Sequence, residues 1–321
     1  MSKALTTTKL IEHVVRKASL PLTRTSLLTD DILAFANEEL DSTIVPYIMS
    51  HKSEYFLSTK IVPLETGLSV YQIPDRAMGN KLRDVSFLDS QGNVYELTQV
   101  FVDDEGQYNS SLNNPLGSNM FAQAKFYMEN DTVVLVPRRQ NVVAGGSLKF
   151  TFYLRQSELI SETDAGRISA VNLTTGVVTI SNLPSTFTLT SEYDIVQAKT
   201  PFKCTSLNIV PTAFDSAAKT VTFNIIDLDT HLKVGDYLCL AEETPIPQIP
   251  VEIHSLLAQK VVCRCLESMG DQNGLAAAMV RVKEMEESLG GLIATRVEAA
   301  AIKVNNMHSF LKRGRYPARW R

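Results

Sequence analysis

Residues 245–270, PIPQIPVEIHSLLAQKVVCRCLESMG, mark the point where the chain changes from strands to helices. The three prolines at its start favour an extended and stiff linker, because proline fixes φ and has no backbone N–H to donate. After them, apolar side chains recur at helical spacing over residues 251–269, and Gly270 is a typical end for a helix. We predict a helix there and a second one from Asp271 to about Thr295.

The N-terminal part of the chain shows the same helical periodicity. Residues 27–47, LLTDDILAFANEELDSTIVPY, place apolar residues about 3.6 positions apart, with Thr29 as a candidate N-cap and Pro46 where the helix should end or bend. A shorter amphipathic piece covers residues 8–18, and a short helix is expected over residues 45–56. We predict that the helices from both chain ends make one helical body.

Between these helices the apolar residues alternate, which is typical of β-strands. Two hairpins are predicted, around Asp89–Asn93 and around Asn130–Asp131, because turn residues stand between alternating runs. Strands over residues 58–64 and 69–73 flank a further predicted turn at 65–67. Residues 148–155, LKFTFYLR, form the most regular strand, and residues 103–119 are predicted to be a long surface loop.

From residue 158 to residue 244 the chain reads as a run of short strands separated by turn signals, which predicts a small sandwich or barrel. The predicted fold class is α+β: a helical body built from N- and C-terminal helices, a central antiparallel β region and an inserted small all-β domain. The predicted parts are 1–157 for the N-terminal helices and β region, 158–244 for the insert, 245–302 for the linker and the C-terminal helical pair, and 303–321 for a basic extended tail.

Charge is distributed unevenly along the chain. The net charge is −4, yet residues 303–321 contain six Lys or Arg and no carboxylate side chain, so residues 1–302 carry −10. An acidic body with a basic tail predicts that the tail has a role of its own. Phe310, Tyr316 and the only tryptophan, Trp320, stand among these cations.

Three interpretations of this tail fit its composition. It is a disordered and solubilising end, or a docking segment for a protein partner, or a contact with nucleic acid. Arginine and aromatic side chains are preferred anchors in protein interfaces, which favours the second interpretation. Arginine also pairs with phosphates and stacks on bases, which favours the third.

The sequence lacks the motifs of common catalytic and metal-binding sites. It contains no GxxxxGK[ST], GxGxxG, HExxH or GxSxG. None of the five histidines stands beside another ligand at metal-binding spacing, and the four cysteines, Cys204, Cys239, Cys263 and Cys265, are predicted to be reduced and structural. We therefore predict a protein that is not an enzyme and has no catalytic residue, cofactor or metal site.

No apolar run approaches the roughly 18 residues that a membrane span requires. Residues 1–10 are polar and lack the apolar region of a secretory signal. We expect no membrane partner and a protein that is made and used without crossing a membrane by the usual route.

One stretch carries a family resemblance. Residues 71–85, YQIPDRAMGNKLRDV, resemble the YxIPxRAxGxxLRDV stretch of the head-to-tail adaptor proteins (neck or connector proteins) of tailed bacteriophages, particularly those with short tails. The early helix LLTDDILAFANEEL and the C-terminal part, from Ile249 onward, are similar in the same way. The similarity covers about half of the chain and excludes residues 158–244.

The resemblance implies a structural virion protein, made in the host cytoplasm and located in the neck at the head-tail junction. Copies of it would form a homo-oligomeric ring, a dodecamer, that connects the capsid portal to the tail, takes part in viral tail assembly and lines the channel for genome ejection. Its partners would be the portal protein and the tail nozzle or fibre proteins, with genomic DNA passing through the lumen without sequence-specific contact. C-terminal segments of the family reach into the portal, so the implied portal-docking residues are Lys312, Arg313, Arg315, Tyr316, Arg319, Trp320 and Arg321.

Two alternatives remain open. The first is a nucleic-acid-associated phage packaging protein that uses the same basic tail. Phosphate binding would weaken steeply with salt, whereas docking through aromatic anchors would weaken much less. The second is a phage-encoded enzyme with a β accessory domain, which requires a pocket with convergent titratable groups.

Overall fold

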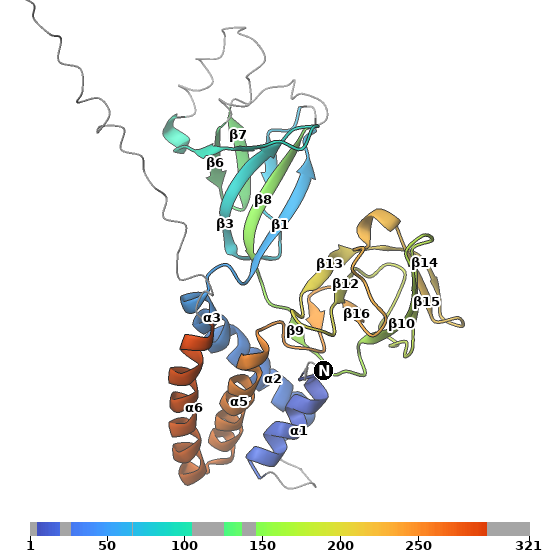
Figure 1. Cartoon of the computed structure of the whole chain (residues 1–321). Coiled ribbons are helices and arrows are strands. Elements are labelled where there is room, and N and C mark those ends of the chain that lie inside the picture. The colour runs from blue at the N-terminus through green and yellow to red at the C-terminus, as the bar shows by residue number, and fades with distance from the viewer. Residues whose placement is uncertain (1–4, 20–26, 66, 105–124, 137–145, 294–321) are drawn as a thin grey trace, which may run out of the picture.

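The computed structural model describes residues 5–19, 27–65, 67–104, 125–136 and 146–293. Within these ranges the helices gather at one end of the molecule, and two groups of strands lie above and beside them (Figure 1). None of the described helices has the length and apolar character to cross a membrane.

Helices from both parts of the chain share one hydrophobic core. Ile32 and Ala36 from the N-terminal side and Leu256 and Val261 from the C-terminal side are all fully buried in it. The helices are α1 (Thr7–Lys17), α2 (Thr29–Glu39), α3 (Val45–His51), α5 (His254–Met269) and α6 (Gln272–Ile293). A 3-10 turn, η5 (Val251–Ile253), precedes α5. We call this group the helical bundle.

The start and the middle of α2 differ from the prediction. Thr29 is the first helical residue and not the N-cap; Leu28 occupies that position, and its backbone N–H donates to the Asp31 carboxylate at 2.8 Å. The stretch predicted as one helix is divided into α2, which ends at Glu39, one π-helical turn, Leu40–Ile44, and α3, which begins at Val45 with Pro46 as its second residue. The short helix predicted over residues 45–56 is thus present and ends earlier, at His51.

The C-terminal helical pair follows the prediction closely. Gly270 ends α5 with φ of 77°, in the left-handed region that glycine adopts without strain. The α6 helix then runs antiparallel to α5 and buries Ala278, Leu289 and Ile293 at helical spacing.

The central β region consists of two four-stranded sheets around one core. The first has the strand order β1-β8-β3-β4, and the second has the order β2-β7-β6-β5. Phe87 and Phe150 from the first sheet pack in the same cluster as Tyr71 and Val133 from the second. The strands are β1 (Leu57–Pro63), β2 (Val70–Gln72), β3 (Ala77–Leu88), β4 (Val94–Glu96), β5 (Thr98–Gln99), β6 (Lys125–Glu129), β7 (Thr132–Val136) and β8 (Ser147–Leu154), with a 3-10 turn at Val102–Asp104.

Both predicted hairpins of this region are present. Strands β3 and β4 pair antiparallel around Asp89–Asn93, and β6 and β7 pair around Asn130–Asp131. The predicted turn at 65–67 does not join paired strands, because β1 pairs with β8 and β2 pairs with β7. The chain therefore crosses from one sheet to the other at this point. Most of the loop predicted over residues 103–119 lies outside the described residues.

The chain between β8 and the linker forms a seven-stranded antiparallel sheet, which we call the insert. Its strands are β10 (Gly166–Asn172), β11 (Val177–Ile180), β12 (Tyr193–Val196), β13 (Cys204–Ile209), β14 (Pro211–Asp215), β15 (Thr220–Phe223) and β16 (Tyr237–Leu240), and η4 (Ile225–Asp227) is a 3-10 turn. The order is β13-β12-β16-β10-β11-β15-β14, and the sheet bends around the core side chains Ile168, Tyr193 and Phe223. Its two edge strands, β13 and β14, do not pair in the described residues, so of the two predicted forms, sandwich or barrel, a closed barrel is not formed.

The insert is attached through one short strand pair. β9 (Glu158–Leu159) precedes the insert and β17 (Glu243–Thr244) follows it, and the two pair in parallel. The side-chain amide of Asn37 on α2 accepts from the Leu159 N–H at 2.7 Å and donates to the Leu159 carbonyl at 3.2 Å. The root of the insert is thus fixed to the helical bundle.

The mixed fold of helices and antiparallel sheets is confirmed at that level. The division of the chain into four parts at residues 157, 244 and 302 stays a prediction.

Candidate interaction surfaces

The predicted portal-docking residues lie outside the part of the chain that the structure describes. They are Lys312, Arg313, Arg315, Tyr316, Arg319, Trp320 and Arg321. The interactions of the remaining residues with one another, and the surfaces that they leave open, provide the candidate sites.

Arg76, within the stretch that carries the family resemblance, links the central β region to the insert. Its Nη1 lies 2.7 Å from Oδ2 of Asp194 on β12, and the two side chains are only 6% and 0% exposed. Nη1 also donates to the Asn208 side chain at 3.2 Å, and Nη2 donates to the Ser157 hydroxyl at 3.0 Å. The Nε atom faces a carboxylate oxygen of Glu242 at 3.5 Å. Each guanidinium nitrogen therefore meets a partner on the insert or at its root.

Two backbone N–H groups also hold the Asp194 carboxylate. Its Oδ1 accepts the backbone N–H of Asn208 at 2.8 Å, and its Oδ2 accepts that of Glu242 at 3.0 Å. A fully buried carboxylate is tolerated only when its charge is paired and its oxygens are hydrogen-bonded. The Arg76–Asp194 pair meets both conditions, so it fixes the position of the insert against the central sheets.

The insert also contacts the helical bundle through an aromatic pair. Phe202, fully buried in the loop between β12 and β13, lies with its ring centroid 5.4 Å from that of His254, the first residue of α5. In the neutral ring, the Nε2–H group of His254 donates a hydrogen bond to the Ile249 carbonyl oxygen at 3.2 Å. Burial lowers the pKa of His254, although nearby carbonyls oppose this. The imidazole is therefore neutral and packs as an aromatic side chain.

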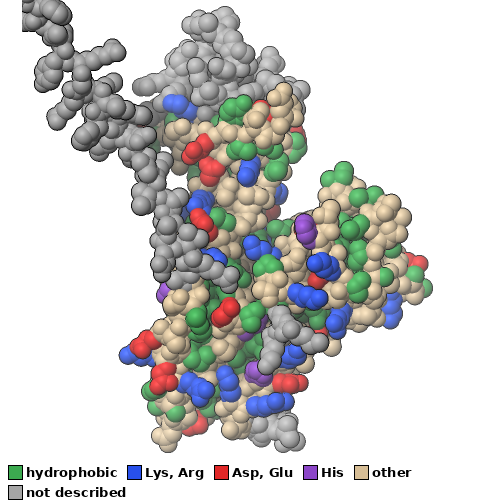
Figure 2. Space-filling model, in the orientation of Figure 1, with side chains coloured by type: hydrophobic (Ala, Val, Ile, Leu, Met, Phe, Trp, Pro, Cys, Tyr) green, Lys and Arg blue, Asp and Glu red, His purple; other side chains and the backbone are tan. Residues whose placement is uncertain are grey.

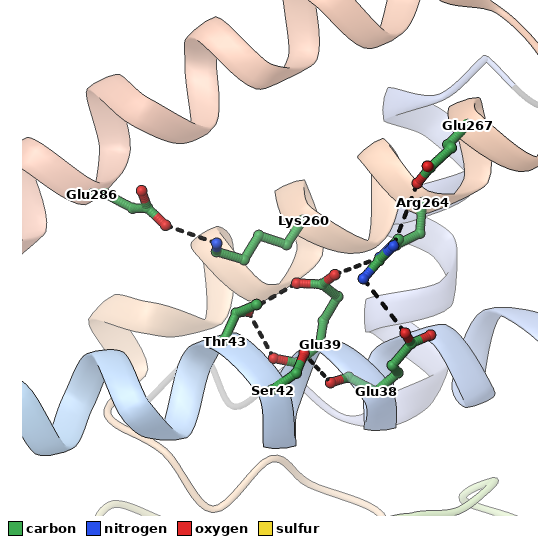
Figure 3. A network of polar contacts seen from close by, with 8 residues as sticks. All are labelled: Glu38, Glu39, Ser42, Thr43, Lys260, Arg264, Glu267 and Glu286. Carbon is green, nitrogen blue, oxygen red and sulfur yellow. Dashed lines mark hydrogen bonds and ion pairs between the residues drawn. The ribbon is translucent and has the colours of Figure 1, made fainter.

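A network of ion pairs crosses the helical bundle (Figure 3). Arg264 on α5 places Nε 2.6 Å from a carboxylate oxygen of Glu39 on α2, and its other nitrogens lie 3.4 Å from Glu38 and Glu267. The second oxygen of Glu39 accepts the Thr43 hydroxyl at 2.8 Å. The Glu39 side chain is 7% exposed, so Arg264 neutralises a nearly buried charge.

The same network continues to α6. Lys260 on α5 donates to Glu286 at 2.7 Å, and the Tyr47 hydroxyl on α3 donates to the Glu286 carbonyl at 2.6 Å. These contacts fix three helices relative to one another. Because their charges are paired within the protein, they hold the arrangement of the helices.

The outer face of α6 has no cover among the described residues. Ala276 and Ala277 are exposed there, and Met279 and Val280 are 59% and 61% exposed. Val280 points directly away from the strip that α6 buries, as the 3.6-residue period requires. This group, which we call the outer α6 face, is a small apolar patch near the start of α6, and the exposed charges of Lys283, Glu284 and Glu287 follow it on the same side of the helix.

The described residues contain no cluster of three or more His, Cys, Asp or Glu side chains that could hold a metal ion. All four cysteines are free, and burial raises the pKa of the Cys204 and Cys239 thiols, so neither is a ready thiolate. The predicted absence of enzymatic activity remains a prediction.

No protein-family model matches the chain, and no curated protein is significantly similar to it.

Proposed function

We propose that this protein is a subunit of a ring in the neck of a tailed bacteriophage, where it connects the capsid portal to the tail and lines the channel through which DNA leaves. The resemblance of residues 71–85 supports this assignment. The contacts of Arg76 also support a structural role, because its buried guanidinium holds the central β region and the insert in a fixed arrangement.

The outer α6 face is the observation that favours a ring. Exposed apolar patches that polar residues surround are common sites of association between proteins. When one face of a subunit binds a different face of the next copy, the repeated contact closes into a ring if the rotation between copies allows it. We propose that a second copy of this chain covers Met279 and Val280, and that twelve copies close the ring.

The portal is the proposed partner of the C-terminal tail. Lys312, Arg313, Arg315, Tyr316, Arg319, Trp320 and Arg321 supply cationic and aromatic anchors for docking. Many copies of a weakly binding tail hold together by avidity when one ring presents them all. We place the tail fibre or nozzle proteins at the other side of the ring.

The first experiment is cryo-electron microscopy of intact particles of the phage that encodes the chain. We expect a closed ring of this chain below the portal, with residues 303–321 ordered against portal protein. If the chain is absent from the particles, the structural role is wrong. If the tail lies along DNA instead, the packaging alternative replaces portal docking.

A variant tests the ring contact separately. Val280→Asp, supplied from a plasmid to a phage that lacks the gene, should lower the number of copies per particle at least tenfold by quantitative mass spectrometry, because a carboxylate cannot be buried unpaired in the contact. Ile226→Asp is the matched control, since Ile226 is 88% exposed on the insert. Equal incorporation of both variants would exclude the outer α6 face from the contact.

A further inference from the structure

A groove of about 770 Å³ opens on the insert beside its loops. Arg167 of β10, Lys199 of the loop after β12 and Lys233 of the loop before β16 line it, and all three side chains are exposed. In Figure 2, Lys and Arg side chains and a histidine gather on the face of the insert that is turned to the viewer. We call this feature the basic groove.

Its loops are held in place by one buried carboxylate. Asp236 accepts the backbone N–H of Ala198 at 3.0 Å and that of Lys233 at 2.9 Å, so it joins the loop of Lys199 to that of Lys233. The third cation is fixed to the same loop through Ile168, the neighbour of Arg167. Its N–H donates to the Asp236 carbonyl at 2.8 Å, and its carbonyl accepts the Gly235 N–H at 2.8 Å. The three cations therefore stand on a preorganised frame.

The three cations outnumber the one carboxylate of the described lining, Asp236, and are not paired with it. None of Arg167, Lys199 and Lys233 forms an ion pair with a carboxylate of the described residues, in contrast to the arginines of the junction and the bundle. His231, at the edge of the groove, is already held by Asp229 at 2.8 Å. Cations gathered in a concave surface raise the local concentration of anionic ligands.

The lining also includes an apolar part, beside the polar side chains of Gln197, Thr200, His231 and Asp236. Val234 is 63% exposed, and Ala198 and Pro201 lie beside it. Sites for single-stranded nucleic acid combine cations with aromatic side chains on which bases stack, and among the described residues the lining of this groove has no Phe, Tyr or Trp; its one ring, His231, is held by Asp229. An extended peptide in which acidic and aliphatic residues alternate offers carboxylates on one face and aliphatic side chains on the opposite face.

We propose that the basic groove binds an acidic peptide segment of a partner protein. Glu or Asp side chains of the segment pair with Arg167, Lys199 and Lys233, and an intervening aliphatic side chain packs on Val234 and Pro201. This inference does not depend on the proposed role in a phage neck.

The test uses the full chain and a fluorescein-labelled peptide of alternating Glu and Val, followed by fluorescence anisotropy at physiological salt. Charge reversal at Lys199→Glu/Lys233→Glu should weaken binding at least about tenfold, which corresponds to about 1.4 kcal/mol. Lys60→Glu/Lys81→Glu, which changes the net charge equally at exposed positions of the central sheets, should change it less than about twofold. Thermal unfolding of both variants checks that each is folded.

Three outcomes overturn the proposal: no binding of the peptide, equal weakening by both double variants, or tighter binding of a labelled DNA duplex that the groove variant abolishes. A second peptide of alternating Glu and Ser tests the apolar part. It should bind more weakly than the Glu–Val peptide to the unmodified chain, and Val234→Ser should remove that difference.

Discussion

The helical bundle and the insert differ in how their cations are paired. In the bundle, Arg264 faces three carboxylates, and Lys260 faces a fourth. In the insert, the cations of the basic groove face solvent and meet no described carboxylate. Paired charges fix the arrangement of elements, whereas unpaired charges on a rigid frame remain available to a ligand. The bundle is accordingly the scaffold, and the insert is the part suited to recognition.

The largest expected effect lies at the junction between the central β region and the insert. Arg76→Met should lower the free energy of unfolding by about 3–5 kcal/mol, because it leaves the fully buried Asp194 carboxylate without its cation. Urea denaturation followed by circular dichroism measures the change. Arg83→Met is the control, since Arg83 forms an exposed pair with Glu54 and its loss should leave stability almost unchanged. Equal losses would mean that the junction is not held by Arg76.

A smaller effect is expected within the bundle. Arg264→Met should lower the free energy of unfolding by about 1–2 kcal/mol, because the nearly buried Glu39 carboxylate loses its cation but keeps its contact with Thr43, and water can enter where the 36% exposed Arg264 side chain stood. The same denaturation assay applies. Lys199→Met, which removes an unpaired charge from the groove, should leave stability unchanged or raise it slightly. If Lys199→Met were as destabilising as Arg264→Met, the contrast between the two regions would be wrong.

The smallest expected effect depends on pH. His254 has a lowered pKa in the fold, so the unfolded chain takes up a proton first as pH falls below about 6.5. The stability that neutral His254 contributes is complete above that pH and declines as pH falls toward the folded-state pKa, by at most about 1.4 kcal/mol per pH unit. His254→Gln should remove this component of the pH dependence. His13→Gln is the control and should leave this component in place, because His13 is exposed on α1.

Local signals in the sequence predicted most of the helices and strands. They did not indicate which strands that lie far apart in the sequence pair with each other. The hairpins at Asp89–Asn93 and Asn130–Asp131 are set by their turn residues, which lie between the two strands that pair. The turn predicted at residues 65–67 has similar turn residues, yet the strands on either side of it do not pair with each other, and β1 pairs with β8 from about ninety residues later. Strand β14 was missed because Pro211 begins it and only Val210 separates it from β13.

The same limit applies to the candidate sites. The stretch at 71–85 contains Arg76, but its sequence gives Arg76 no role, because the partner Asp194 is 118 positions away and nothing in the local sequence connects them. The basic groove assembles cations from three separate segments, none of which forms a charged run. In contrast, the C-terminal tail is a compact basic run and is therefore visible in the sequence alone.

The short parallel pair of β9 and β17 has a consequence for how such a protein can evolve. The polypeptide leaves the scaffold and returns to it at adjacent points, since Glu158 stands opposite Glu243 and Leu159 opposite Thr244. An inserted segment whose two ends lie side by side places little constraint on the path of the surrounding chain. The recognition module can therefore be exchanged as a cassette while the scaffold keeps its shape, provided that the replacement offers a carboxylate to Arg76 and an apolar side chain to His254.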